Sequence, residues 1–459
     1  MSAPFSSLKL PAAQLEIIAD LGLKHMTEIQ AQSLPISLAG KDLLAQAPTG
    51  SGKTVAFSLP LLRNLKPRNY AVQALVLCPT RELAGQVATE IRRLARYPGN
   101  IKVLTLCGGQ PIGPQIGSLE HGAHVIVGTP GRISDHIRKG TLDLSQVNTL
   151  VLDEADRMLD MGFQDEILQI VGYTPADRQS MLFSATFPQN IEQIGRDVLT
   201  NPELVQVEAI AEQQPDIEQR VYLTEPDEQV ETLLAVLTDA EPEAAVIFCN
   251  TREQCNELAT ALRQYGVSSG VLHGDLDQRQ RDQMLVRFTN GSLRLLIATD
   301  VAARGLDIDS VDLVVNLNLP RERAVFTHRC GRTGRAGRQG LAISIIFEKE
   351  QYKLNLIAEE IGFDLTPQRA PSLNTNKLGV LAAEMRTLEL ASGRKNKIRP
   401  GDIVGALTAT KEIDGKDIGN ISVQDFQSFV ALPKALADRG VEILRNRSLK
   451  GKNVRVRKI

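Results

Sequence analysis

A glycine-rich loop near the start of the chain carries residue types that bind phosphate. It runs from Ala47 to Thr54 and reads A-P-T-G-S-G-K-T. In such a loop the backbone N–H groups and the lysine ammonium hold phosphate oxygens, and the last hydroxyl can bind Mg²⁺. We therefore expect Lys53 to contact phosphate and Thr54 to contact the metal. All eight loop residues are candidates for nucleotide binding: Ala47, Pro48, Thr49, Gly50, Ser51, Gly52, Lys53 and Thr54.

Two adjacent carboxylates follow an apolar run further along the chain. Asp153 and Glu154 come directly after the segment 149–152, which reads T-L-V-L. An aspartate at the end of a strand is the usual second anchor for Mg²⁺ in nucleoside triphosphatases, and a neighbouring carboxylate can orient or deprotonate water. Asp153 is therefore predicted to bind metal, and Glu154 is predicted to act on the attacking water.

A basic cluster occupies residues 328–335 and reads H-R-C-G-R-T-G-R. Arginines spaced by three, with glycines between them, suit a close backbone approach to phosphate. An arginine that reached a γ-phosphate from a second domain would couple hydrolysis to domain closure. A basic helix end with a glycine cap is the alternative that this pattern leaves open.

Short apolar runs alternating with amphipathic stretches must position these groups. The runs cover residues 42–47, 71–78, 103–106, 125–127, 149–152 and 181–183, and then 221–223, 246–249, 270–273, 295–298, 313–317 and 342–347. This alternation predicts βαβ units and two mostly parallel sheets, with ligands at the carboxyl ends of the strands. Polar segments at 208–219 and 363–376 are predicted linkers. We therefore expect domains at 1–207, 220–362 and 377–459.

Composition is that of an ordinary globular enzyme, with 42% apolar and 23% charged residues. The five cysteines are odd in number and form no C-x-x-C pair, which disfavours a disulfide framework or a zinc site and favours a reducing compartment. No cationic leader precedes an apolar core, and no run approaches 18 apolar residues. We expect a cytoplasmic protein with no membrane partner.

The last segment of the chain is basic although the net charge of the whole is −2. Residues 377–459 hold 17 Lys and Arg against 9 Asp and Glu. Neutralisation of phosphates by such side chains is the main sequence-independent source of affinity for nucleic acid. The asymmetry suggests a polyanion-binding domain, and a solvated face that serves solubility is the alternative.

The pattern of this segment predicts the order βαββαβ. The expected elements are a strand at 385–390, a helix at 400–409, strands at 418–423 and 426–432, a helix at 433–444 and a strand at 453–456. This order resembles an RNA-recognition-motif domain. Phe426 and Phe429 are present, but Gln427 and Ser428 occupy aromatic and glycine positions of the stacking signature. Phosphate or groove contact by the basic tail 445–458 is therefore favoured over base stacking, and an edge strand with its arginines facing water is equally compatible.

Taken together, the motifs resemble those of the DEAD-box ATP-dependent RNA helicases over roughly residues 5–361. The chain contains the ordered set Pro79-Thr80-Arg81-Glu82-Leu83, Gly108-Gly109, Thr129-Pro130-Gly131-Arg132, Asp153-Glu154-Ala155-Asp156, Ser184-Ala185-Thr186, the stretch from Ala302 to Asp307, and His328-Arg329 with Gly331-Arg332 and Gly334-Arg335. The resemblance implies an α/β fold of two tandem RecA-like parallel-sheet domains plus a C-terminal α+β RNA-recognition-motif-like domain. It also implies ATP and Mg²⁺ as cofactors and RNA as partner.

The same resemblance implies roles for individual residues. Gln30 would read adenine, with Phe5 stacking near the base, and Asp307 would contact the nucleotide. Arg332 and Arg335 would meet the γ-phosphate, and His328 would link the two domains. The residues implied on the RNA side are Thr80, Arg81, Gly109, Thr129, Arg132, Gln278, Arg281 and Thr299. Helix capping is an alternative role for any single Ser or Thr among them.

The basic third domain makes the chain most similar to the bacterial DEAD-box protein A group, whose additional domain directs the enzyme to large-subunit ribosomal RNA. This resemblance implies an RNA helicase that separates short duplexes and is targeted to 23S ribosomal RNA during assembly of the large ribosomal subunit. The alternative is an ATP-gated RNA clamp or assembly factor without productive strand separation. A DNA translocase is disfavoured by the Gln30 motif and by the sequence Asp-Glu-Ala-Asp at residues 153–156.

Overall fold

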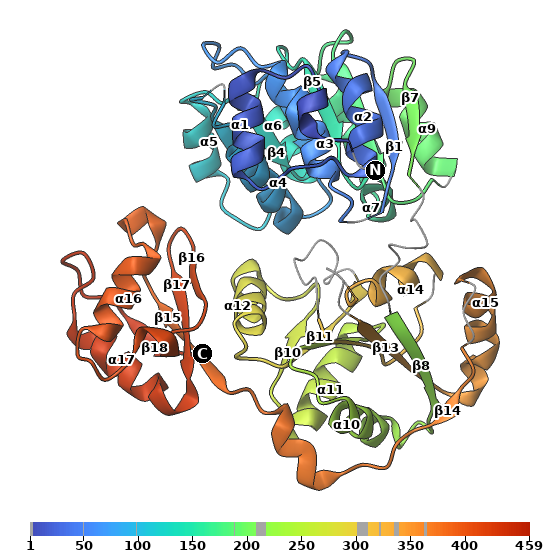
Figure 1. Ribbon diagram of the computed structural model, residues 1–459, viewed down its shortest axis with the longest axis vertical. Coiled ribbons are helices and arrows are strands. Elements are labelled where there is room, and N and C mark those ends of the chain that lie inside the picture. Colours follow the sequence, from blue (N-terminus) through green and yellow to red (C-terminus); the bar gives the residue numbers. More distant parts are fainter. Residues whose placement is uncertain are drawn as a thin grey trace. The chain divides into compact units, whose positions relative to one another are not determined.

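The computed structural model describes residues 3–48, 50–97, 99–187, 189–207, 217–300, 311–320, 323–334, 339–361 and 365–459. Thr49, Asp307 and Arg335, which the sequence analysis singled out, lie outside these ranges. Three sheets organise the described residues, and Figure 1 labels most of their strands. The predicted class, two parallel α/β domains followed by a small α+β domain, is confirmed.

The first sheet lies within residues 43–206 and all its strand pairs are parallel. Its strands are β1 (Leu43–Gln46), β2 (Ala74–Leu77), β3 (Val103–Leu106), β4 (Val125–Gly128), β5 (Thr149–Leu152), β6 (Gln179–Ser184) and β7 (Glu203–Gln206). They run in the order β3-β4-β2-β5-β6-β1-β7. Strands β2, β4, β5 and β6 are buried along their whole length, as expected where helices cover both faces. Strand β7 was not predicted, because only one of its residues is buried.

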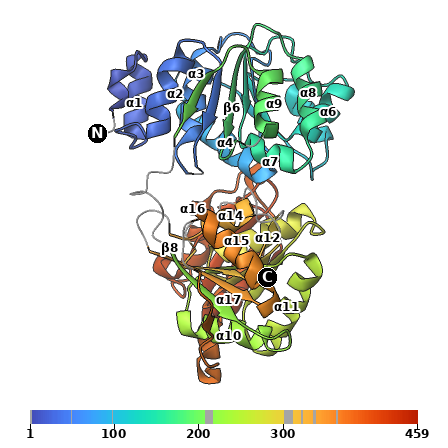
Figure 2. The ribbon, with the colours of Figure 1, turned by 90° about the vertical axis from the view of Figure 1, so that its right-hand side faces the viewer.

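Helices cover both faces of this sheet, as Figure 2 shows on either side of β6. One face carries α1 (Ala12–Asp20), α2 (Glu28–Leu38), α3 (Lys53–Arg63) and α4 (Arg81–Leu94), and the other carries α6 (Pro130–Arg138), α7 (Ala155–Asp160), α8 (Gln164–Gly172) and α9 (Gln189–Val198). A short helix, α5 (Gly113–Leu119), follows β3. Because all strands are parallel, their carboxyl ends meet at one edge of the sheet.

The second sheet repeats this architecture. Its strands are β8 (Ile217–Leu223), β9 (Ala245–Phe248), β10 (Ser269–Leu272), β11 (Leu295–Ala298), β12 (Leu313–Asn316), β13 (Gly340–Ile346) and β14 (Gln368–Arg369), in the order β10-β11-β9-β12-β13-β8-β14. Helices α10 (Gln229–Ala240) and α11 (Arg252–Gln264) pack on one face, and α14 (Arg323–Cys330) and α15 (Gln351–Ile361) pack on the other. Helix α12 (Gln278–Thr289) follows β10.

Both segments interpreted as linkers contribute to this second sheet. β8 begins at Ile217, inside the predicted linker 208–219, and pairs with β13 over its whole length. β14 lies inside the predicted linker 363–376 and extends the sheet beside β8. The following 3₁₀ segment, η4 (Thr375–Leu381), buries Leu381 in the core on the α10 face, and Lys377 forms an ion pair with Glu241 at 2.6 Å. Residues 365–381 thus form a strap packed on the second domain, because leucines within the polar segment supply apolar anchors.

The third sheet is antiparallel, with β15 (Met385–Leu390), β16 (Ile421–Val423), β17 (Ser428–Pro433) and β18 (Val456–Lys458) in the order β16-β17-β15-β18. Helices α16 (Pro400–Thr408) and α17 (Ala437–Asn446) pack on one face. The predicted order βαββαβ is therefore confirmed. Pro433 does not begin the second helix as predicted: it ends β17, and a 3₁₀ turn, η7 (Lys434–Leu436), precedes α17.

Among the described residues, no helix is both long enough and apolar enough to cross a membrane. All five cysteines are buried and none is in a disulfide. Burial raises the pKa of Cys330 to about 12 and that of Cys107 to about 11, as expected for small hydrophobes inside a core.

Candidate active site

The phosphate loop connects β1 to α3 at the carboxyl edge of the first sheet. Gly50 and Gly52 adopt left-handed backbone angles, with φ of 81° and 93°, so the loop turns tightly before the helix begins at Lys53. The first N–H groups of α3 therefore point into the loop, where an anion is stabilised. The Lys53 ammonium is buried and donates to the Ala47 carbonyl at 2.9 Å. Thr54 follows in the first helical turn.

The predicted carboxylates stand at the end of β5, which is a neighbour of β6 and lies two strands from β1. Asp153 is 3% exposed, and its Oδ1 atom is buried without a hydrogen-bond partner. Burial raises the pKa of Asp153 to about 7, and the positive charge of Lys53 opposes this rise. A buried, unsatisfied oxygen beside a lysine is the environment in which a cation would supply the missing partner.

Glu154 adopts a left-handed backbone conformation, with φ of 53°, directly before α7. Such a conformation is uncommon outside glycine and turns the chain sharply at the strand end. The Glu154 carboxylate is buried and accepts a hydrogen bond from Arg157 at 2.7 Å. Arg157 thus fixes the orientation of this carboxylate.

Asp156 connects the acidic motif to the end of β6. Its Oδ2 atom accepts hydrogen bonds from the N–H groups of Ala185 and Thr186 and from the Thr186 hydroxyl, all between 3.0 and 3.1 Å. The Ser184 hydroxyl in turn donates to the Thr186 carbonyl at 2.6 Å. Residues 184–186 are therefore rigidly attached to the strand end that carries Asp153. The sequence analysis assigned no role to Asp156, although its position within the acidic motif is the signal.

Gln30 lies against the phosphate loop. Its Oε1 atom accepts from the Thr27 N–H at 2.9 Å, which caps α2, and its Nε2 atom donates to the Gly52 carbonyl at 3.0 Å. A Cβ atom on Gly52 would approach Gln30 Nε2 to 2.4 Å, so glycine is required at this position for the contact. The structure thus joins the predicted adenine reader to the predicted phosphate loop.

Phe5 is 3% exposed and belongs to the core on the same face of the sheet. The segment that carries it is attached to the chain before α2, because the Met26 N–H donates to the Ala3 carbonyl at 2.8 Å. In this arrangement the aromatic ring is enclosed by the core of the first domain.

The RNA-side candidates of the first domain stand at the opposite half of the same edge. Thr80 follows β2, Gly109 follows β3 and Thr129 follows β4, whereas the nucleotide candidates follow β1 and β5. Since the sheet order is β3-β4-β2-β5-β6-β1-β7, the two sets separate between β2 and β5. The Thr80 hydroxyl caps α4 by accepting from the Leu83 N–H at 3.3 Å.

Arg132 links two of these loops. Its Nη2 atom donates to the Gln110 carbonyl at 2.9 Å, while its Nε and Nη1 atoms are buried without hydrogen-bond partners. Arg81 occupies the first turn of α4, directly after Thr80.

In the second domain, Arg329 in the basic cluster is a core residue, 1% exposed. Its guanidinium donates twice to Asp300, at 2.6 and 2.8 Å, and it stacks 5.1 Å above the Phe248 ring centre. Further hydrogen bonds reach the side chains of Asn316 and Asn250 and the carbonyl of Asn318. This structural role of Arg329 is not apparent from the sequence of the basic cluster. The signal was its spacing of three from buried Phe326 on α14.

The other candidates of the second domain surround this buried pair. His328 adjoins Arg329 on α14, and Arg332, in the turn after the helix, is 6% exposed. Thr299 follows β11 and adjoins Asp300. Gln278 and Arg281 lie in the first turns of α12, where Gln278 donates to Asp282 at 2.7 Å.

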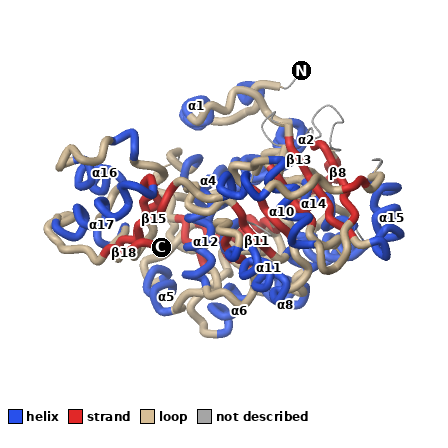
Figure 3. The backbone as a smooth tube through the Cα atoms, turned by 90° about the horizontal axis from the view of Figure 1, so that it is seen from below, coloured by secondary structure: helices blue, strands red, loops and turns tan. Residues whose placement is uncertain are grey.

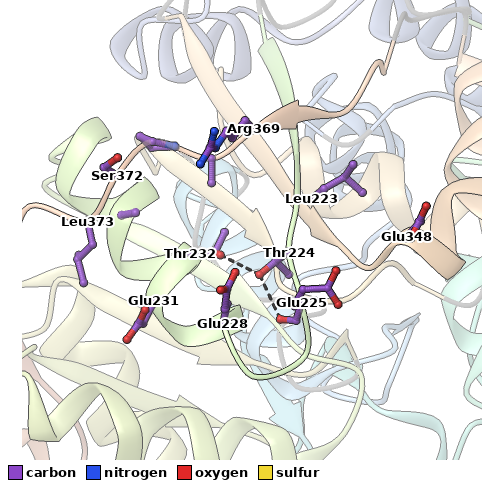
Figure 4. A pocket seen from close by; sticks show the side chains of 13 residues that line it. Leu223, Thr224, Glu225, Glu228, Glu231, Thr232, Glu348, Arg369, Ser372 and Leu373 are labelled. Carbon is purple, nitrogen blue, oxygen red and sulfur yellow. Dashed lines mark hydrogen bonds between the residues drawn. The ribbon is translucent and has the colours of Figure 1, made fainter.

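A cavity of about 460 Å³ in the second domain lies away from all of these candidates. Figure 4 shows the side chains that line it, including Glu225, Glu228, Glu231 and Glu348 opposite Arg369. Four carboxylates against one guanidinium disfavour a phosphate ligand, so the cavity is not a second nucleotide site.

Comparison with known proteins agrees with this geometry. Residues 27–194 match the DEAD/DEAH box helicase family, residues 228–337 match the helicase conserved C-terminal domain, and residues 387–458 match the DbpA RNA binding domain. Saccharomyces cerevisiae Dbp5 bound to RNA and ADP BeF3 superimposes with a TM-score of 0.70 at 30% identity, covering 83% of this chain and 99% of that one. The chain belongs to the DEAD-box RNA helicase family, whose members are RNA-stimulated ATPases that act on RNA with ATP.

Two full-length relatives refine this assignment. The chain is 49% identical to the ATP-dependent RNA helicase DbpA of Escherichia coli and 36% identical to that of Bacillus subtilis, with 99% of each chain covered in both comparisons. Together with the match of its third domain, these similarities place the chain in the DbpA group.

Proposed function

We propose that this ATP-dependent RNA helicase is directed by its third domain to a structured element of 23S ribosomal RNA during assembly of the large ribosomal subunit. The observation that carries the proposal is a basic rim on that domain, formed by exposed Arg394, Lys395, Lys397, Arg399, Lys450 and Lys452. An ion pair of 2.9 Å between Lys450 and Asp402 holds the 450 loop at the start of α16, next to Arg399. Cations gathered on a rigid rim suit the phosphates of a folded RNA.

We further propose that the edge at β1 and β5 performs the chemistry on ATP. Lys53 and the first N–H groups of α3 would hold the phosphates, and Gln30 the adenine. Thr54 and Asp153 would hold Mg²⁺, which fits the unsatisfied Oδ1 atom of Asp153. When bound by these residues, Mg²⁺ would neutralise negative charge on the phosphates.

The Glu154 carboxylate, oriented by Arg157, would position the attacking water and accept its proton. Arg332 and Arg335 would stabilise the negative charge on the γ-phosphate. Asp307 would contact the nucleotide, and His328 would link the second domain to the first. These roles rest on the resemblance to the family, residue by residue.

For the RNA strand, we propose contact through its backbone at residues that follow β2, β3 and β4 and at the first turns of α12. Short hydroxyls and backbone N–H groups suit sugar and phosphate rather than base edges, so the helicase domains would accept any sequence. Preference for one RNA would then come from the basic rim.

A charge-removal experiment on the full chain tests the targeting proposal. Replacing Lys395, Lys397 and Lys452 with alanine should weaken binding to a 23S ribosomal RNA hairpin. The slope of log K against log salt concentration should become shallower by about one for each phosphate contact that is lost. RNA-stimulated ATPase with an unrelated single strand should stay near the unmodified level. The matched control replaces Lys411 and Lys416, exposed lysines after the other end of α16.

For the unmodified protein and for each variant, displacement of a short RNA strand must be measured as well as ATPase turnover. If the rim variant still prefers the ribosomal hairpin over an unrelated RNA of equal length, the targeting proposal is wrong. If the unmodified protein hydrolyses ATP on ribosomal RNA without displacing a short strand, a clamp describes its activity better.

A further inference from the structure

The two central strands of the third sheet, β15 and β17, bury side chains on both faces, although the helices of this domain cover only one. Leu388, Leu390 and Val430 point to α16 and α17 and form the domain core. Side chains alternate along a strand, so Thr387, Glu389 and Phe429 point to the other face. Yet Thr387 and Phe429 are fully buried and Glu389 is 3% exposed. A second structure must therefore cover this face.

Helix α12 of the second domain and the turn that follows it supply that cover. Figures 1 and 3 both show α12 beside β15, on the side away from α16 and α17. Arg279 donates to Glu389 Oε1 at 2.7 Å and Gln283 donates to Glu389 Oε2 at 3.1 Å. At the start of β15, Arg294 and Glu384 approach to 3.6 Å.

Glu389 is a carboxylate that the third domain alone would leave incompletely paired. Within its own domain, Arg457 places Nε 2.7 Å and Nη2 2.6 Å from Glu389 Oε2, whereas Glu389 Oε1 accepts from Arg279 on α12. A buried charge is tolerated when opposite charge and hydrogen bonds satisfy it. The burial of Glu389 therefore requires the hydrogen-bond donors that α12 of the second domain supplies.

A second polar contact lies in the same seam, by which we mean the contact between β15 of the third domain and α12 with the turn that follows it. The Asn290 amide donates to the Thr387 hydroxyl at 2.9 Å, and that hydroxyl lies 2.8 Å from the hydroxyl of Ser292. All three residues are at least nine-tenths buried. A buried network with satisfied partners fixes one orientation, because any shift would leave polar groups unpaired.

The connection between the domains is short enough to keep the seam closed. Leu381 is anchored in the core of the second domain, and β15 begins at Met385. The connecting residues 382–384, even when fully extended, span on the order of 10 Å. A tether this short gives a high effective concentration, so weak individual contacts suffice for docking.

We infer that this sheet face is an intramolecular docking surface for α12, formed by Thr387, Glu389 and Phe429, and that it does not read RNA bases. Phe429 is buried and cannot stack on a base, and the Glu389 carboxylate is taken up by Arg279 and Arg457. The docked domain is held on the helix that carries Gln278 and Arg281. On the proposed function, RNA bound at the basic rim is therefore held at a fixed distance from the strand-contacting turns of α12.

A disulfide trap in the full chain tests the docking without any RNA. The side chains of Asn290 and Thr387 meet within hydrogen-bond distance, so docking brings thiols at these two positions close to each other. The five native cysteines are buried and are present in every variant, so a crosslink that forms only in the double variant comes from the new pair. We expect an intramolecular crosslink under mild oxidation in N290C/T387C and none in either single variant. Absence of the crosslink would overturn the inference.

The trapped protein also tests whether the docked form is the working form. It should retain RNA-stimulated ATPase and its RNA preference within about twofold of the reduced protein. Loss of both on oxidation, with recovery on reduction, would show that the face must open and would refute the inference. If the crosslink forms on oxidation but the RNA preference is absent in the reduced and oxidised forms alike, the result would instead contradict the proposed targeting and leave the docking supported.

A charge variant tests the role of Glu389. Arg279→Glu places a carboxylate against the buried Glu389, and we expect the rate of N290C/T387C crosslinking to fall about tenfold or more, because a charged hydrogen-bond donor is replaced by a like charge. The matched control is Arg263→Glu, at an exposed arginine near the end of α11, which should crosslink at the original rate. Equal rates in the two variants would show that Glu389 does not hold the seam.

Discussion

Replacing Arg329 with alanine should unfold the second domain at a lower temperature rather than remove a catalytic group. The guanidinium is 1% exposed and makes five hydrogen bonds, two of them to Asp300. Removal of one partner from a buried ion pair costs about 3–5 kcal/mol because a desolvated charge is left behind. The Asp300 side chain is 24% exposed, so water can reach it and we take the lower end, about 3 kcal/mol.

This loss corresponds to a fall in Tm of about 6–12 °C for a domain of this size. Arg329→Lys should show a smaller fall, since an ammonium keeps the charge but cannot bridge both Asp300 oxygens and the asparagine acceptors together. The measurement is thermal unfolding of the full chain, followed by RNA-stimulated ATPase well below the transition. Arg332→Ala provides the comparison, because it should lower ATPase at temperatures well below its own unfolding transition.

The stabilising role of the Arg329 network has a direct test in the free energy of unfolding. If Arg329→Ala changes the unfolding free energy of the second domain by less than about 1 kcal/mol, the buried network does not stabilise the fold as the hydrogen bonds suggest. A loss of ATPase in that background would then have to come from the site itself.

Three further predictions concern the first domain. Glu154→Gln should bind ATP almost normally but hydrolyse it about 10²- to 10⁴-fold more slowly in single-turnover assays, and near-normal hydrolysis would exclude Glu154 as the base. The asparagine of Asp156→Asn has one acceptor oxygen, so it cannot accept from both the Thr186 groups and the Arg157 N–H. The free energy of unfolding should fall by about 1–3 kcal/mol, which calorimetry would detect as a lower Tm. An unchanged Tm would contradict the assigned contacts. Because the pKa of Asp153 is raised to about 7 in the nucleotide-free domain, binding of Mg²⁺ with nucleotide should ionise it and release a proton below pH 7. Affinity should therefore strengthen from pH 6 to 8; titration calorimetry in two buffers should detect the proton, and Asp153→Asn should abolish the release.

The sequence predicted the carboxyl-edge arrangement because apolar runs and glycine turns are local signals. The phosphate loop, the end of β5 and the turn after β2 all stand where parallel strands require. Edge strands were less predictable. β7 and β14 exist because a neighbouring strand offers its free N–H and C=O groups, and their own sequences are too polar or too short to show this.

Roles that depend on distant partners were also invisible in the sequence. Arg329 was taken as part of a phosphate-binding cluster, but the acceptors that bury it come from Asn250, Asp300 and Asn316, on other strand ends. Likewise, the paired burial of Glu389 depends on α12, more than a hundred residues earlier. No local pattern marks a charged residue as buried when its partners lie so far away.

The parallel sheet of the first domain has a consequence for how the protein is made. β1 pairs with β6 and β7 and with no earlier strand, so the strand that leads into the phosphate loop has no neighbour until β6 is synthesised. The intervening chain takes roughly 7–26 s to emerge at about 5–20 residues per second. During that interval β1 is a candidate for chaperone binding, and ATP can stabilise the nascent domain only after β6 has left the ribosome.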